Sequence, residues 1–248
     1  MTPRFGDEFL LHIATRGLKL GQLASDTFSI APLSSSPAML AALGTLTHLH
    51  RLDFRDCARG DKKTVDGQAQ FIPNFQYDVK QLANLSNLGS LRLPHNNELA
   101  KQLASVLCVD NIHTLSSRFT ELPDLTPIAK SLEELEMDET PAGIAALCAI
   151  KLPALEALCI RVRKTPLFPL FLPTYAINAD FFAHLASFDN LYELQLESDL
   201  DVPAVEALAL LTRLRVLRIG QATGPFALLV PGLAQSVYEL SISVARHD

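Results

Sequence analysis

Residues 132–140 read LEELEMDET, and this stretch decides the fold because its pattern returns along the chain. Apolar residues stand at Leu132, Leu135 and Met137, and a polar residue, Thr140, ends the motif. The alternation of the last two apolar residues predicts a short strand with one buried face. The pattern L-x-x-L-x-L-x-x-N/C/T therefore defines a unit that can be sought in the rest of the sequence.

The same apolar pattern occurs at seven further places. Residues 49–57 (LHRLDFRDC) and 88–96 (LGSLRLPHN) also keep the polar end, at Cys57 and Asn96. Copies with the apolar triplet alone begin at residues 155, 191, 214 and 237, and a weaker copy with Ser117 in the third apolar place begins at residue 112. Phe28 and Ile30 suggest a degenerate first copy. Successive copies begin 39, 24, 20, 23, 36, 23 and 23 residues apart.

Most of these steps lie within the period of about 20–29 residues that characterises leucine-rich repeats. From about Phe28 to Val244 the sequence resembles the helix-containing leucine-rich-repeat proteins, with irregular repeats of about 20–24 residues. The resemblance implies an α/β solenoid, a curved horseshoe with a parallel β-sheet on the concave face and short helices on the convex face. Stacked coils would share one continuous core, because no single coil can bury its own apolar face.

The domain organisation follows from the repeat. We expect a single domain overall, with an N-terminal cap segment at 1–24 and a repeat domain of about 8–9 coils at 25–248. Two insertions, near 57–76 and 163–176, interrupt the period. Helices are expected at 98–107, 177–187 and 202–214, and after the Ser36-Pro37 and Thr140-Pro141 pairs, because a capping residue followed by proline favours a helix start.

Composition limits the classes of function. The formal net charge of −6 argues against nucleic acid as the partner. No run of about 20 apolar residues predicts a membrane span, and the first residues do not resemble a signal peptide. Four scattered cysteines indicate free thiols and a reducing, cytoplasmic compartment. Secretion into a host by a route that needs no signal peptide stays open.

The candidate partner-binding residues are those expected between the buried leucines, because side chains alternate along a strand. The basic ones are Arg51, Arg55, Arg92, Arg118 and Arg161, and the acidic ones are Glu134, Glu136, Asp138, Glu193 and Glu197. With Glu139, residues 134–139 form an acidic cluster that would gain from a basic partner. The alternative is an ordinary solvated surface. Phe168 and Phe171, in the second insertion, either cap the core or anchor a partner.

Catalytic interpretations are weak. No G-x-S-x-G, Gly-rich phosphate loop or H-E-x-x-H occurs. His48 and His50, near Asp53 and Asp56, are a poor metal signal, and Cys159 has no histidine at the matching position of a neighbouring coil. We expect no catalytic residues, no metal and no cofactor.

The expected function is protein–protein recognition through the concave face and the adjacent rim loops. Two alternatives remain open: a secreted bacterial effector that engages a host protein, and the substrate-recognition part of a larger enzyme, such as a ubiquitin-ligase-type assembly. The last predicted strand runs to Val244 without a cap, which leaves two interpretations open: the chain is a part of a larger protein, or this strand pairs with a partner or with a second copy of itself.

Overall fold

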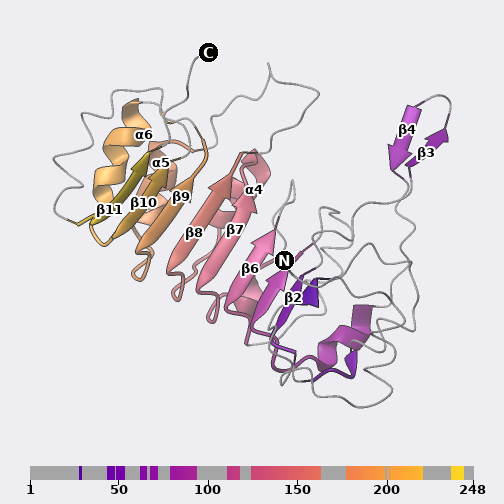
Figure 1. Ribbon diagram of the computed structural model, residues 1–248. Coiled ribbons are helices and arrows are strands. Elements are labelled where there is room, and N and C mark those ends of the chain that lie inside the picture. Colours follow the sequence, from indigo (N-terminus) through magenta and orange to yellow (C-terminus); the bar gives the residue numbers. More distant parts are fainter. Residues whose placement is uncertain are drawn as a thin grey trace. The chain divides into compact units, whose positions relative to one another are not determined.

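The computed structural model describes residues 28–29, 44–47, 49–53, 62–65, 68–71, 79–93, 111–117, 124–162, 177–198, 200, 202–219 and 236–242 (Figure 1). Its contacts divide the chain into two compact units. The first comprises Met1–Arg118 with Pro123–Ile128, and the second comprises Phe119–Leu122 with Ala129–Asp248. The predicted cap at 1–24, the insertion at 163–176, and the predicted helices at 98–107 and after Ser36-Pro37 lie outside the described residues.

The first unit contains parallel strands in the order β1–β2–β5–β6. They are β1 (Phe28–Ser29), β2 (Arg51–Asp53), β5 (Ser90–Arg92) and β6 (Thr114–Ser117). The register aligns Leu52, Leu91 and Leu115, each at most 2% exposed. Two 3-10 helices, η3 (Val79–Asn84) and η4 (Thr126–Ile128), belong to the same unit.

The insertion near 57–76 contains a β-hairpin. Strands β3 (Lys62–Val65) and β4 (Gln68–Phe71) pair antiparallel, with Lys62 opposite Phe71. Only Asp66 and Gly67 separate them. Asp-Gly is favoured in two-residue hairpin turns because both residues tolerate a positive φ. This dipeptide is the signal from which the hairpin could have been predicted.

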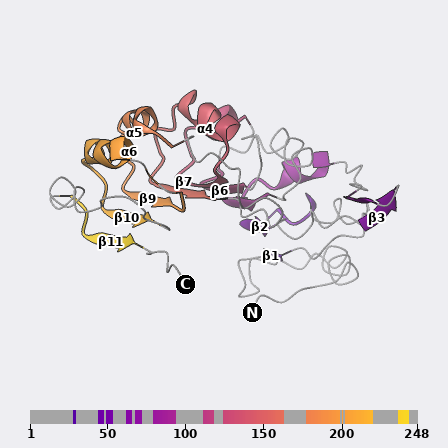
Figure 2. The same ribbon diagram turned by 90° about the horizontal axis from the view of Figure 1, so that it is seen from above.

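The second unit contains five parallel strands in the order β7–β8–β9–β10–β11. They are β7 (Glu134–Asp138), β8 (Ala157–Arg161), β9 (Glu193–Leu196), β10 (Val216–Ile219) and β11 (Glu239–Ile242). Helices α4 (Pro141–Cys148), α5 (Ala179–Leu185) and α6 (Val202–Ala207), with η5 (Leu208–Leu210), lie between strands in the sequence. Figure 2 shows α4, α5 and α6 on one face of this sheet.

The core of the second unit is a row of residues in register across its strands. Leu135, Leu158, Leu194 and Leu217 are aligned, and each is at most 2% exposed. Burying a leucine side chain contributes about 1.5–3 kcal/mol. Phe181 and Phe182 of α5 are also buried and meet edge to face, with 5.6 Å between ring centroids.

The backbone path repeats from coil to coil just before each strand. The carbonyl of Glu133 accepts hydrogen bonds from the N–H groups of Glu156 and Ala157, at 2.8 and 3.0 Å. In the first unit, the carbonyl of His50 accepts in the same way from Gly89 and Ser90, each at 2.9 Å. The pair of bonds recurs with Glu156, Tyr192 and Arg215 as acceptors in the second unit and with Gly89 in the first. These bonds join equivalent residues of successive coils, and they satisfy backbone groups that the turn before each strand would otherwise leave unpaired.

A tight turn precedes four of these bond pairs and strand β2. The N–H of Leu155 donates to the carbonyl of Leu152 at 3.1 Å, and Leu214 donates to Leu211 at the same distance. Equivalent bonds join Leu49 to Leu46, Leu88 to Leu85, and Leu191 to Phe188. The repeat therefore has another buried apolar position three residues before the motif defined from the sequence.

Helices α4 and α5 each begin after a residue whose side chain caps the first turn. Thr140 is the N-cap of α4 and accepts a hydrogen bond from the N–H of Gly143 at 3.0 Å, with Pro141 in the first turn. Asn178 caps α5 by accepting from the N–H of Phe181, also at 3.0 Å. A β-carbon on Gly143 would lie 2.8 Å from Oγ1 of Thr140 and 2.9 Å from Cε of Met137, so glycine permits this close approach.

These elements test the predicted fold class and three of the predicted helices. The α/β class with parallel strands is confirmed, and helices occur within the predicted segments 177–187 and 202–214 and after Thr140-Pro141. The leucine-rich-repeat solenoid stays a prediction. No helix in the described part of the chain is long and apolar enough to cross a membrane.

Candidate functional site

The second unit has one sheet face that carries mainly polar side chains. In β8, Leu158 and Ile160 are at most 1% exposed, whereas Ala157, Cys159 and Arg161 are half-buried. Because side chains alternate along a strand, Leu158 and Ile160 point toward the helices, and the other three residues point to the opposite face of the sheet. We call that opposite face the polar sheet face. Its partly or fully exposed residues are Glu134, Glu136, Ala157, Cys159, Arg161, Glu193, Gln195, Glu197, Arg218, Glu239 and Ser241.

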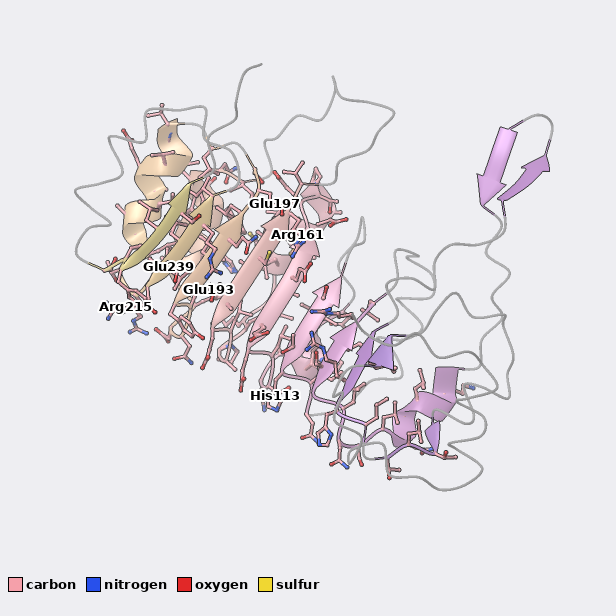
Figure 3. All side chains as sticks on the ribbon, in the orientation of Figure 1. His113, Arg161, Glu193, Glu197, Arg215 and Glu239 are labelled. Atoms are coloured by element: carbon pink, nitrogen blue, oxygen red, sulfur yellow. The ribbon has the colours of Figure 1, made fainter. Side chains whose placement is uncertain are left out.

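No described helix or strand of the second unit lies over the polar sheet face (Figure 2). Strand register places its side chains in rows. Glu136, Cys159, Gln195, Arg218 and Ser241 occupy equivalent positions on successive strands. Figure 3 shows Arg161 and Glu197 near one end of their strands and Glu193 and Glu239 near the other.

Two arginines connect neighbouring strands on this face. Arg161 Nε lies 2.9 Å from Glu136 Oε1, an ion pair whose angles do not form a hydrogen bond. Arg218 Nη2 lies 2.8 Å from Glu239 Oε1, and Arg218 also pairs with Glu193. Partly exposed pairs of this kind contribute about 0–1 kcal/mol each. Their main effect is to hold charged groups in a defined pattern across the strands.

The polar sheet face keeps an excess of negative charge after these pairings. Its carboxylates are Glu134, Glu136, Glu193, Glu197 and Glu239, and its described cations are Arg161 and Arg218. Five carboxylates against two guanidinium groups give a formal net charge of −3. A field of one sign over a continuous surface attracts a partner of opposite charge.

The predicted acidic cluster at 134–139 is not uniformly exposed. Glu134 is exposed and Glu136 is half-buried, but Asp138 is only 5% exposed and stands in register with Arg161. The half-buried Glu139 accepts a hydrogen bond from the hydroxyl of Ser198. These carboxylates therefore differ in exposure, and Glu134 is the most exposed of them.

Cys159 lies in the middle of the polar sheet face but is not an activated thiol. Burial raises the pKa of its thiol above the ordinary value, while the hydrogen bond and the charge of Arg161 act in the opposite direction. A thiol with a raised pKa is mostly protonated at neutral pH and is a weak nucleophile. Glu136 and Gln195 are its register neighbours, and neither can activate it as a histidine would.

The predicted residues of the first unit lie on neighbouring strands. Arg51 is half-buried on β2 and stands opposite Ser90 in β5, while Arg92 is half-buried and stands opposite Asp53. The remaining candidates lie outside the described residues: Arg55, Arg118, Phe168 and Phe171.

The weak metal interpretation gains nothing from the structure. Among the described residues no group of three or more His, Cys, Asp or Glu side chains could hold a metal ion. His50 is exposed, and His48 and Asp56 lie outside the described part of the chain.

The sequence interpretation missed Glu239, which contributes to the polar sheet face through Arg218. A signal existed, because Tyr-Glu-Leu occurs at both 192–194 and 238–240, at the same place in the repeat. Glu193 and Glu239 therefore flank Arg218 from the two strands beside β10.

The sequence interpretation also missed an asparagine ladder on the edge before the strands. Asn190 donates its side-chain N–H to the carbonyl of Pro153 at 2.8 Å. Asn87 and Asn111 make equivalent bonds to Thr47 and Ser86, each at 2.7 Å. The signal was a recurring asparagine directly before the first apolar residue of a copy.

The comparisons with protein-family models and with curated proteins found no relative of this chain. No protein-family model matches the chain, and no curated protein matches it.

Proposed function

We propose that this chain is a leucine-rich-repeat-type solenoid that recognises a protein partner through the sheet face opposite its helices. The proposal is supported first by the repeated backbone of the described coils. The same pair of hydrogen bonds precedes successive strands, and core leucines occupy equivalent register positions. A stack of equivalent coils is the architecture in which leucine-rich repeats present an extended binding surface.

The observation that carries the proposal is the polar sheet face. Five adjacent strands of the second unit present side chains there, and no described element of that unit covers them. Fixed ion pairs at Arg161 and Arg218 give this surface a defined charge pattern without the entropy cost of ordering long side chains on binding. The net charge of the face favours a partner that presents basic or hydrogen-bond-donating groups.

A charge-reversal experiment tests the proposal. The variant Glu134→Lys/Glu136→Lys changes the charge of the polar sheet face by four units. A matched control, Asp180→Lys/Glu206→Lys, makes the same change at exposed positions of α5 and α6. Both variants should keep the far-UV circular dichroism of the parent. The control should also keep its thermal midpoint, within the scatter usual for surface substitutions, whereas the face variant should melt at a lower temperature, because Glu136→Lys places an ammonium group beside Arg161.

The readout compares the proteins that each variant retains from the same lysate, followed by titration calorimetry with the purified protein identified. A partner kept by the parent and the control but lost by the face variant supports the proposal. Its affinity should fall as salt rises, since the charges that attract it are exposed. If every retained protein binds the face variant and the control equally well, recognition does not use this face.

A further inference from the structure

Strand β11 carries an exposed leucine at a position that is buried in the neighbouring strand. Leu240 is in register with Leu217 of β10, which is fully buried, yet 47% of Leu240 is exposed. Tyr238, just before the strand, is 76% exposed. Among the described strands β11 pairs with β10 alone. The second unit therefore ends, within its described part, in an edge strand that leaves a core leucine open.

The backbone of β11 determines which groups face this edge. Glu239 donates its N–H to the carbonyl of Arg215 at 3.2 Å, so its backbone groups point toward β10. In a parallel pair, the N–H and C=O groups of successive residues point to opposite edges of the strand. The N–H and C=O of Leu240 consequently point away from β10, where another strand could pair with them.

We infer that β11 pairs antiparallel with β11 of a second copy of this chain, with the two Leu240 residues opposite each other. In this arrangement the outward N–H and C=O of each Leu240 bond to those of its counterpart. Side chains directly opposite each other lie on one side of a sheet. The two exposed leucines therefore cover each other on the side that forms the core. This contact uses the strand edge and does not depend on the proposed role of the polar sheet face.

Charge disfavours one neighbouring register. With Leu240 at the centre, Glu239 lies opposite Ser241 of the copy, and Tyr238 lies opposite Ile242. Moving the centre to Glu239 would bring two carboxylates directly opposite each other, which is destabilising. Among the registers that the outward backbone groups allow, the one centred on Leu240 places the two exposed leucines opposite each other.

The first test is the oligomeric state of the full chain. Sedimentation velocity over a concentration series should show a dimer that dissociates on dilution. Leu240→Lys places two ammonium groups opposite each other and should raise the dimer dissociation constant at least about tenfold. Leu210→Lys is the matched control, because Leu210 is 52% exposed but lies on η5. The control should dimerise as the parent does.

The second test uses cysteine cross-linking and does not require the Leu240→Lys variant to fold. Opposed residues of a hydrogen-bonded antiparallel pair have Cα atoms about 5.5 Å apart, within the range of about 4.4–6.8 Å that a disulfide spans. Leu240→Cys should therefore cross-link on mild oxidation, and the parent and Leu210→Cys should not. A mixture of Glu239→Cys and Ser241→Cys should cross-link, whereas Glu239→Cys alone should not.

Three results would overturn the inference. The chain could remain monomeric at the highest concentration, the Leu240→Lys and Leu210→Lys variants could dimerise equally, or Leu240→Cys could fail to cross-link in a dimer. Binding of another protein's strand by a monomeric chain would likewise show that the edge serves a different occupant.

Discussion

Substituting Gly143 by alanine tests the close packing at the start of α4. The residue lies in a helix, where alanine is intrinsically better than glycine by about 1 kcal/mol. Propensity alone therefore predicts that Gly143→Ala stabilises the protein. The structure predicts the opposite, because the new methyl group would lie 2.8 Å from Thr140 Oγ1 and 2.9 Å from Met137 Cε. Both contacts are too short to persist.

The magnitude follows from what must move. Displacing the Thr140 hydroxyl weakens the cap bond to the Gly143 N–H, which costs about 1 kcal/mol. Met137 Cε is the far end of a flexible side chain, so moving it within its buried site adds about 1 kcal/mol, the low end of an overpacking cost. After the gain in helix propensity, Gly143→Ala should lower the free energy of unfolding by about 1 kcal/mol. For a chain of this size, each kcal/mol lowers the thermal midpoint by about 2–4 °C.

A double-mutant cycle separates these contributions. Thr140→Ala alone should cost about 1 kcal/mol through the lost cap. In Thr140→Ala/Gly143→Ala the hydroxyl no longer obstructs the methyl group, so the combined loss should be smaller than the sum by about 0.5 kcal/mol or more. Urea unfolding of the four proteins measures the cycle. A neutral or stabilising Gly143→Ala, or strictly additive losses, would refute the close-packing argument.

Two further predictions concern the edge ladder and the polar sheet face. Asn190→Ala removes the side-chain bond to the preceding coil and should lower the free energy of unfolding by about 1 kcal/mol in a urea titration, whereas Asn190→Asp, which cannot donate, should lose at least as much. Cys159 should be alkylated slowly at pH 7 and faster as the pH rises, because burial raises its thiol pKa and only the thiolate reacts. Arg161→Gln removes the group that lowers this pKa, so the alkylation profile should move to higher pH; an unchanged profile would contradict the assigned contact.

The strands, the core and the helix starts could be predicted from sequence because each depends on local order. The alternation at Leu135 and Met137 identifies β7, and Thr140-Pro141 identifies the start of α4. The spacing between copies also predicts that their leucines stack. The hairpin β3–β4 was missed although its Asp-Gly signal is local.

The charge pattern of the candidate site could not be predicted, because it depends on register between segments more than twenty residues apart. Arg161 pairs with Glu136, and Arg218 pairs with Glu193 and Glu239, only when the strands are aligned side by side. The same alignment brings Asp138 opposite Arg161.

The sequence by itself determined which residues can form the core, since burial of alternate side chains follows from the period of the strand. Only the tertiary structure decided which of them are buried. Leu217 and Leu240 occupy the same position of the same motif, yet one is fully buried and the other is 47% exposed. Burial in a stack of coils depends on the neighbouring coil, and a strand's own sequence does not specify that neighbour.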